Sequence, residues 1–507
     1  MGELIRLNAD SMKTLLVPER LDLIIKYLYI DSYMNNNQVY LELYKRHIAY
    51  RTGGVEDHKS SINDYVEEFH ALIDDIRING FDENYPIPVS RHNGIILDGA
   101  HRLACCLYFK KSAYVEYRDI EGSKWDYKWL IKNGFQSDLD KIYKEYIRIK
   151  SANTFIAILW GPIRNHWDEV ERIISKKHTI VGRMDFSFNS SVFLSVLEEI
   201  YAYEFGIRMS SRIEEKGRFL LRFPSEFAMV MFDVREPNYF YEDETLVCKQ
   251  VLELKNGIRN DMNSIVEKER FATIHTSDNE GHTAYLSSLL LSENNLKVIS
   301  NKDLNKPREE FLSWLEEYMR VMEDYGLSKE ECCIVGSSSL EVLGIRKSTD
   351  IDFIISEQKR DSYFPDTFLQ LSANVDIASR GYHEKSNKEI TFTDNQIIFD
   401  EDKHFYFRGL KFAALDIIKD RKSFERRPKD MKDIMLIDEY LQKNLSKQQK
   451  RLWRSILRKV LMVYKIYIVA YFRHGFVHQV KRVVWRNLSV KQREHVKKYL
   501  GKIRKTI

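Results

Sequence analysis

The sequence predicts a multidomain chain of α/β and α+β domains that ends in a basic helical tail. Its 507 residues exceed the usual size of one domain, about 100–200 residues. An apolar share of 44% with 30% charged residues is typical of folded protein. Residues 441–507 contain 19 Lys and Arg against one acid, a net +18, whereas the first 440 residues contain 60 basic and 74 acidic side chains, a net −14. The tail is therefore chemically different from the body.

The first predicted domain, residues 1–150, contains a turn suited to phosphate. A helical pattern ends at Asn79-Gly80, and the runs 85–90 and 94–97 are expected to form a pair of strands. They lead into Asp98-Gly99-Ala100-His101-Arg102, a tight turn that opens a helix. Backbone N–H groups, an imidazole and a guanidinium aimed at one point would bind a phosphate, and Asp98 would hold the turn or act as a base.

This stretch resembles the ParB/sulfiredoxin-like domain over about residues 60–120, through Pro86-Ile87-Pro88-Val89 and the turn that begins at Asp98. That family includes CTP-binding partition proteins, ATP-using sulfiredoxin and a free serine kinase. The resemblance implies contacts of Gly99, His101 and Arg102 with nucleotide phosphates, in a kinase or in a domain that only binds nucleotide. Ala100 stands where sulfiredoxin has its reactive cysteine, so reduction of sulfinic acids is not expected. A domain kept only as a scaffold is the alternative.

Residues 151–305 are expected to form a central α/β domain. Strand 155–160, a turn at Gly161-Pro162, helix 168–174 and strand 178–181 give a β-α-β pattern. A later strand from residue 271 runs into a helix through His282, and ligands of open α/β sheets bind where strands end. The sequence suggests an anionic ligand there, with simple helix capping as the alternative. The candidate side chains are His275, Asp278, His282, Lys255, Arg259 and Arg183.

Residues 306–442 contain the largest number of candidate catalytic and phosphate-binding residues. Cys332-Cys333-Ile334-Val335 is expected to be a buried strand, and the turn Gly336-Ser337-Ser338 leads into a short helix. Asp350 and Asp352 are two residues apart, so on a strand both carboxylates project from one face. Paired carboxylates without a basic partner suit Mg²⁺ or Mn²⁺ together with substrate phosphates.

A two-metal arrangement needs a third carboxylate. Asp376 in Ala373-Asn374-Val375-Asp376-Ile377 is the first candidate, because it lies on the next predicted strand. Asp394 and Asp400 are alternatives, since they also flank strand-like runs. The expected metal ligands are thus Asp350, Asp352 and Asp376.

This segment resembles the nucleotidyltransferase superfamily that includes DNA polymerase beta, over about residues 310–440. The shared features are Gly-Ser, a helical spacer, Asp-x-Asp and a later strand Asp. The resemblance implies metal-dependent transfer of a nucleotidyl group from a nucleoside triphosphate, with Asp350, Asp352 and Asp376 as catalytic residues. It also implies phosphate contacts from the turn and from downstream basic residues. The expected nucleotide-binding residues are Gly336, Ser337, Ser338, Arg346, Lys419 and Lys429.

The five cysteines favour reduced thiols. Cys105-Cys106 and Cys332-Cys333 are adjacent pairs within apolar runs and lack the spacing of a zinc site. The N-terminus, Met1-Gly2-Glu3-Leu4-Ile5-Arg6, shows no signal-peptide core. The expected location is therefore cytoplasmic.

The tail, residues 443–507, combines aromatic and aliphatic residues at helical spacing with many Lys and Arg. Its apolar runs are too short to cross a bilayer. A basic amphipathic helix through residues 450–486 fits the anionic inner face of a cell membrane. Nucleic acid is a rival partner, because phosphate attraction needs only charge, and packing on the acidic body is a third alternative.

Together these features suggest a peripheral membrane enzyme of cell-surface glycan or glycolipid synthesis. The nucleotidyltransferase domain would activate a small phosphorylated or hydroxyl-bearing metabolite, and the first domain would bind nucleotide or add a phosphotransferase activity. Two alternatives remain: nucleotidyl transfer to protein or nucleic acid, and a nucleotide-sensing scaffold without turnover.

Overall fold

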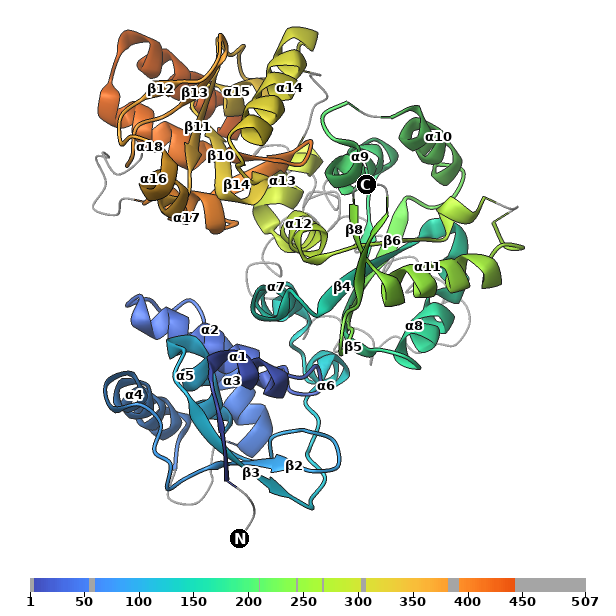
Figure 1. Cartoon of the computed structure of the whole chain (residues 1–507), viewed down its shortest axis with the longest axis vertical. Helices are drawn as coiled ribbons and strands as arrows, with labels where there is room; N and C mark the ends of the chain where they lie inside the picture. Colours follow the sequence, from blue (N-terminus) through green and yellow to red (C-terminus); the bar gives the residue numbers. More distant parts are fainter. Residues whose placement is uncertain are drawn as a thin grey trace, which may run out of the picture. The chain divides into compact units, whose positions relative to one another are not determined.

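The computed structural model describes residues 4–53, 60–208, 210–242, 245–266, 269–301, 307–381 and 392–442. The chain forms two compact units, Met1–Glu425 and Arg426–Ile507. Among its described residues the first unit is a mixed α/β structure with four separate sheets, and Figure 1 labels most of its helices and strands. Within the second unit, the described residues 428–442 are helical.

The N-terminal part of the first unit is built on a three-stranded sheet in the order β1-β3-β2. Strand β3 (Ala113–Arg118) lies between β1 (Leu4–Leu7), which is antiparallel to it, and β2 (Ile87–Ser90), which is parallel. Helix α4 begins at a capping box between Ser61 and Asp64, which fixes its start. The helices of this part are α1 (Ala9–Met12), α2 (Asp22–Met34), α3 (Leu41–Thr52), α4 (Ile62–Asn79), α5 (Ala100–Phe109), α6 (Tyr127–Lys132) and α7 (Leu139–Lys150).

The predicted strand over residues 94–97 is wrong. The chain turns at Gly94, whose φ of +69° is left-handed, and makes only a single bridge between Ile96 and Val89. A second left-handed glycine, Gly99, follows at the start of α5. The short distance between these two turns leaves no room for an extended ladder.

A buried ion cluster lies at the start of α2. The Asp22 carboxylate accepts from Arg20 Nε at 2.7 Å and from Lys26 Nζ at 2.8 Å, and all three side chains are buried. Burial alone would raise the pKa of Asp22, but the charges of Arg20 and Lys26 outweigh it and hold that pKa well below its usual range. Arg20 also donates to the carbonyl of Ile96, so the cluster ties the turn before α5 to α2.

The central part contains a four-stranded sheet in the order β5-β6-β4-β9, in which every neighbouring pair is antiparallel. Its strands are β4 (Thr154–Trp160), β5 (Thr179–Ser187), β6 (Glu226–Asp233) and β9 (Ile274–Thr276). All seven residues of β4 are buried, as expected of a continuous apolar run in an interior strand. The predicted strand-helix-strand order is present, but β6 separates β4 from β5.

The helices of the central part are η3 (Gly161–His166), α8 (Trp167–Ser175), α9 (Ser190–Phe205), α10 (Ser211–Leu220), α11 (Lys249–Asp261), α12 (Glu280–Leu291) and α13 (Glu293–Asn301). Strands β7 (Tyr239–Glu242) and β8 (Thr245–Cys248) form a separate two-stranded hairpin. The predicted helix over 168–174 corresponds to α8.

The third part is a six-stranded mixed sheet in the order β12-β13-β11-β10-β15-β14. Its strands are β10 (Cys332–Val335), β11 (Ile351–Ile355), β12 (Leu369–Gln370), β13 (Val375–Ile377), β14 (His404–Phe407) and β15 (Leu410–Ala413). Strand β11 is antiparallel to β10 and parallel to β13. The helices are α14 (Glu309–Asp324), α15 (Ser338–Val342), α16 (Glu357–Tyr363), α17 (Asp394–Phe399) and α18 (Leu415–Glu425).

The turn between β14 and β15 contacts the central part. The backbone N–H of Arg408 donates to Glu199 Oε2 at 2.8 Å, and its guanidinium pairs with Glu198 at 3.0 Å. The N–H of Tyr406 donates to Asn295 Oδ1 at 2.6 Å. Buried and partly buried polar contacts thus join the central and third parts within the first unit.

The five cysteines are buried free thiols, as expected. The basic tail, residues 443–507, lies outside the described residues, and so does the helix expected over 450–486. Within the described ranges, the structure contains no helix with the length and apolar character that crossing a membrane requires.

Candidate active site

The strand register brings two of the predicted carboxylates together. Asp352 on β11 stands directly opposite Asp376 on β13, and the two strands are parallel. Directly paired residues on neighbouring strands project to the same face of a sheet. Asp350 lies one residue before β11 begins, so it enters the site from the preceding bend rather than from the strand itself.

The two alternative carboxylates lie elsewhere. Asp394 is the first residue of α17, is buried, and accepts the backbone N–H of Gly381 at 3.1 Å. Asp400 is the C-cap of the same helix. The register therefore places Asp376, and not Asp394 or Asp400, beside Asp352.

Gly336, in the turn after β10, lies close to the Asp352 carboxylate. The residue has a φ of +69°, and a Cβ placed on it would lie 3.0 Å from Asp352 Oδ2. A left-handed backbone and this close approach both favour glycine. The turn after β10 is thus shaped around the carboxylate.

The serines of this turn hold the Asp350 loop. Ser338 Oγ donates to the carbonyl of Asp350 at 2.9 Å, and Ser348 Oγ donates to the same carbonyl at 2.8 Å. Ser337 Oγ lies 2.8 Å from Ser348 Oγ. Ser338 is fully buried, so its hydroxyl positions the loop, and the expected contact of this hydroxyl with phosphate is not available in this arrangement.

An ion pair between Arg308 and Glu341 also contacts the loop that carries Asp350. Arg308 makes two parallel contacts with Glu341, Nε to Oε1 at 2.8 Å and Nη2 to Oε2 at 2.9 Å. Glu341 also accepts the backbone N–H of Ser348 at 2.5 Å, and Arg308 donates to the Ser348 carbonyl at 2.8 Å. These contacts fix residue 348 two positions before Asp350.

The charges of this site favour a cation. Burial, and then the nearby charge of Asp350, raise the pKa of Asp376 above its usual value. Asp376 Oδ1 is buried and has no hydrogen-bond partner among the described residues. In the same part of the chain neither Asp350 nor Asp376 forms an ion pair with Lys or Arg. Carboxylate oxygens in this state fit a Mg²⁺ or Mn²⁺ ion.

The three predicted basic residues lie outside the strands that carry Asp352 and Asp376. Arg346 lies in the loop before β11 and donates to the Lys347 carbonyl at 2.6 Å, and Lys419 lies on α18. Neither forms a hydrogen bond or ion pair with Asp350 or Asp376. Lys429 is an exposed residue of the second unit, Arg426–Ile507.

The structure separates the predicted phosphate contacts of the N-terminal turn. His101 turns toward the helices, where its Nε2 lies 3.0 Å from Tyr44 Oη and its ring packs edge-on against Phe69. Burial, followed by the charges of Lys26 and Arg51, lowers the pKa of His101 well below its usual value, so the ring is neutral.

Arg102 folds back over Gly99 instead, where a Cβ would lie 2.8 Å from its Nη2. It donates to the Tyr85 carbonyl and lies 4.0 Å from the exposed Asp98 carboxylate. Consecutive helix residues do not face each other. The expectation that the imidazole and guanidinium converge on one point is therefore wrong for this conformation.

The central candidates fall into two groups. His275, Asp278 and His282 lie close together, with Lys255 Nζ 3.1 Å from Asp278 Oδ1 and Arg259 donating to the Ile274 carbonyl. Arg183 is on β5, at the opposite edge of the four-stranded sheet, so its assignment to this group is wrong.

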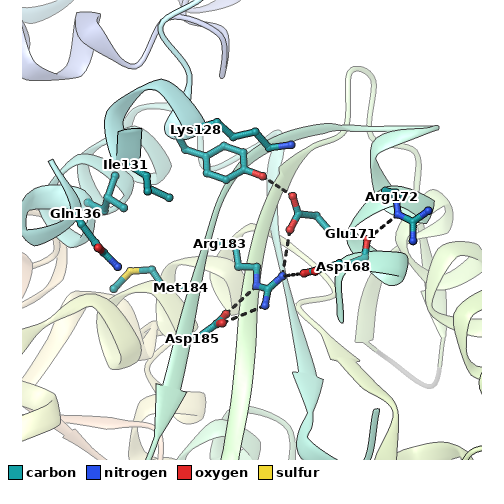
Figure 2. A pocket seen from close by; sticks show the side chains of 11 residues that line it. Lys128, Ile131, Gln136, Asp168, Glu171, Arg172, Arg183, Met184 and Asp185 are labelled. Carbon is teal, nitrogen blue, oxygen red and sulfur yellow. Dashed lines mark hydrogen bonds and ion pairs between the residues drawn. The ribbon is translucent and has the colours of Figure 1, made fainter. Parts of the chain in front are cut away.

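Figure 2 shows the surroundings of Arg183, a cavity of about 640 Å³. Its guanidinium pairs with three carboxylates, those of Asp168, Glu171 and Asp185. Tyr127 donates to Glu171 from the facing side. The guanidinium of Arg183 thus already pairs with carboxylates that line this cavity.

Four residues of these sites were missed from the sequence: Arg308, Glu341, Ser348 and Glu204. The first three support the Asp350 loop, and Glu204 lies beside His275. A Glu three residues after Ser338, and a Ser two before Asp350, were the available local signals. The positions of Arg308 and Glu204 had no such signal.

A scan against protein-family models, a search of curated proteins and a search of solved structures found no match to this chain.

Proposed function

We propose that this chain is a metal-dependent nucleotidyltransferase whose active site is formed by Asp350, Asp352 and Asp376. The observation that carries the proposal is the direct pairing of Asp352 and Asp376 on parallel strands, with Gly336 against the first carboxylate. Carboxylates that share one face of a sheet suit divalent cations and the phosphates bound to them.

Each residue has a separate task in this proposal. Asp350 and Asp352 would hold the metal ion, and Gly336 has no side chain that would press on Asp352 Oδ2. Asp376, whose Oδ1 has no hydrogen-bond partner among the described residues, would be the third carboxylate ligand and would activate the acceptor oxygen. When bound, Mg²⁺ or Mn²⁺ supplies positive charge to the triphosphate oxygens and to the departing pyrophosphate.

The acceptor in this proposal is a small phosphorylated or hydroxyl-bearing metabolite, activated at a membrane surface. The contrast between a body of −14 and a tail of +18 supports this setting, because a basic tail is attracted to anionic lipid. Nucleotidyl transfer to a protein or a nucleic acid is the alternative that the assay must separate.

The test is pyrophosphate release by the purified full chain with each of the four nucleoside triphosphates and Mg²⁺. Asp352→Asn and Asp376→Asn are each expected to lower the rate at least 100-fold. Asp416→Asn changes an exposed carboxylate at the start of α18 in the same domain and should leave the rate unchanged.

Labelled nucleotide identifies the acceptor, since label is expected in a small product and not in protein or nucleic acid. No pyrophosphate with any nucleotide and a panel of sugar phosphates and polyols would refute the function. An unchanged rate in both Asp variants would refute the site.

A further inference from the structure

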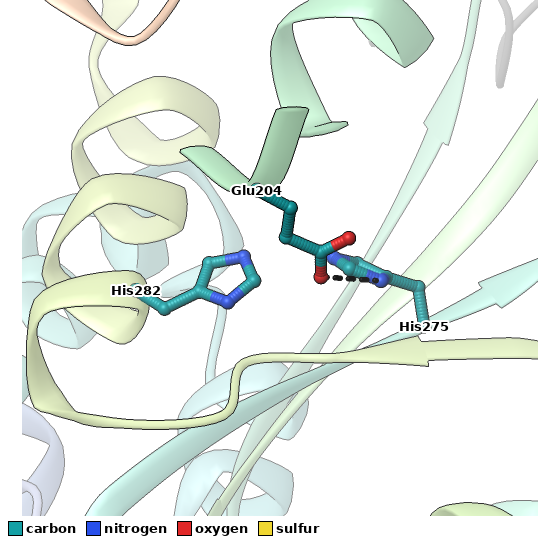
Figure 3. Close-up of side chains that lie close together, drawn as sticks. All are labelled: Glu204, His275 and His282. Atoms are coloured by element: carbon teal, nitrogen blue, oxygen red, sulfur yellow. Dashed lines mark ion pairs between the residues drawn. The ribbon is translucent and has the colours of Figure 1, made fainter. Parts of the chain in front are cut away.

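We propose that Glu204, His275 and His282 form a second metal site, for a divalent transition metal ion. The site is in the central part and does not depend on the proposed nucleotidyl transfer. One ligand atom from each residue lies within 4.8 Å of the other two. Figure 3 shows the three side chains converging from the end of α9, from β9 and from the first turn of α12.

The two imidazoles have nitrogen atoms without a partner. Nε2 of His275 and Nε2 of His282 are buried and make no hydrogen bond with any described residue, and their side chains are 3% and 1% exposed. A buried polar atom without a partner costs free energy. A neutral imidazole nitrogen is the commonest metal ligand in proteins, so an ion would satisfy both rings.

Asp278 borders the other nitrogen of His282. Its backbone N–H donates to His282 Nδ1 at 3.4 Å, and its carboxylate lies 3.8 Å from the same nitrogen. Lys255 holds that carboxylate from the other side at 3.1 Å. In a metal-bound His282 the proton would be on Nδ1, which faces the Asp278 carboxylate, and a carboxylate at this position is the usual way to orient such a ring.

Glu204 completes the donor set. Its carboxylate receives no hydrogen bond from the described residues, and its Oε1 lies 3.8 Å from His275 Nδ1. The side chain is 27% exposed, which gives an ion access from solvent. Two imidazoles with one carboxylate suit Zn²⁺, Fe²⁺ or Mn²⁺ better than Mg²⁺, and three protein ligands leave coordination positions open.

The neighbouring cations indicate what fills the open positions. The charges of Lys216, Lys255 and Arg259 all act on His275. Burial lowers the pKa of Lys216 well below its usual value, so Lys216 is left out of the charge count. Lys255 and Arg259, which contact Asp278 and the Ile274 carbonyl, give with Glu204, Asp278 and one divalent ion a formal charge of +2. An anionic oxygen ligand, a phosphate or carboxylate group, would relieve this excess.

The test uses chelator-treated full chain carrying Asp350→Asn and Asp352→Asn, so that the carboxylate site does not contribute. Titration calorimetry with Zn²⁺ and the visible spectrum with Co²⁺ are expected to show one tight equivalent. Glu204→Gln and His282→Gln should each weaken binding at least tenfold. His166→Gln is the matched control, since its ring pairs with a glutamate, Glu169, at the surface of the same domain.

Two outcomes would overturn the site: no tight equivalent in the parent chain, or equal affinity in the parent and in Glu204→Gln. Glu204 is partly exposed, so its variant decides the matter even where circular dichroism shows that His282→Gln misfolds. Inorganic phosphate added to the Co²⁺-loaded chain should shift the visible bands, and an unchanged spectrum would overturn the anionic co-ligand.

Discussion

Arg308 donates hydrogen bonds from two nitrogen atoms to the Glu341 carboxylate, and this carboxylate also accepts the backbone N–H of Ser348. This contact connects the residue before α14 to the loop that carries Asp350. Glu341 is 4% exposed, so water cannot replace the contacts that it makes.

Glu341→Gln should therefore destabilise the first unit by about 1.5–3 kcal/mol, the range for hydrogen bonds to charged groups. Urea unfolding measures this loss. Glu310→Gln removes the other ion pair of Arg308, whose carboxylate side is 62% exposed, and should change stability by less than about 0.5 kcal/mol. Equal losses in both variants would contradict the proposed role of Glu341.

Gly336→Ala should lower the rate of pyrophosphate release strongly and the stability of the chain only modestly. A left-handed φ costs an alanine about 1–2 kcal/mol, and the added methyl would press on Asp352 Oδ2. Pyrophosphate release should fall at least tenfold. Gly326→Ala is the control, because Gly326 has a φ of +61° with no atom within 4 Å of an added Cβ. It should show the stability loss and normal activity.

Lowering the pH should lower the free energy of unfolding of the third part, because His404 is buried there. The ring is buried and lies 2.9 Å from the Ile397 carbonyl, and burial lowers its pKa to about 3. In the unfolded chain a histidine titrates near pH 6.5, so between about pH 6.5 and 3 only the unfolded state takes up this proton. Stability then falls as pH falls through that window, by up to about 1.4 kcal/mol per pH unit.

Unfolding in urea at several pH values between 7.5 and 4.5 measures that slope. His404→Gln should be less stable at pH 7.5 but should lose less stability on acidification than the parent chain. Identical slopes in the two proteins would contradict the assignment.

Replacing Glu199 should lower the stability of the chain more than replacing Glu198, because the two side chains make different contacts between the central and third parts. Glu199 is fully buried and accepts the Arg408 N–H, so Glu199→Ala leaves a buried donor unsatisfied and should cost about 1–3 kcal/mol. Glu198 pairs with the Arg408 guanidinium in a partly exposed position, and Glu198→Ala should cost less than about 1 kcal/mol. Thermal unfolding of the two variants gives the comparison.

Removal of residues 443–507 should abolish binding to anionic vesicles. The basic residues of the tail each add about 1 kcal/mol of attraction near such a surface. Flotation with vesicles containing phosphatidylserine measures binding, and neutral vesicles are the control. A full chain that shifts labelled RNA or DNA in a gel but does not float would favour nucleic acid instead.

Three strands of the third part, β10, β11 and β13, could be predicted from local sequence pattern, whereas β12, β14 and β15 were not. A four-residue apolar run, a glycine turn and two Asp residues at period two indicate β10 and β11 without tertiary information. The position of Asp376 followed from the same local pattern. The sequence could not give the register that pairs it with Asp352, because register depends on the loops between strands.

The supporting residues were harder to predict for a physical reason. Arg308 and Glu341 are far apart in the sequence, and Glu204 is separated from His275 by several elements. Folding alone brings such groups together. The convergence of His101 and Arg102 failed for the opposite reason, since adjacency in sequence places consecutive helix side chains on different faces.

The three-residue length of β13 makes the proposed site depend on one alignment. A slip of a single residue along β11 would turn Asp376 to the opposite face of the sheet, away from Asp352. Such a slip would leave Asp350 and Asp352 without the third carboxylate. Insertions between α16 and β12 should be tolerated, whereas one residue added within β13 should remove the third carboxylate while leaving the sheet folded.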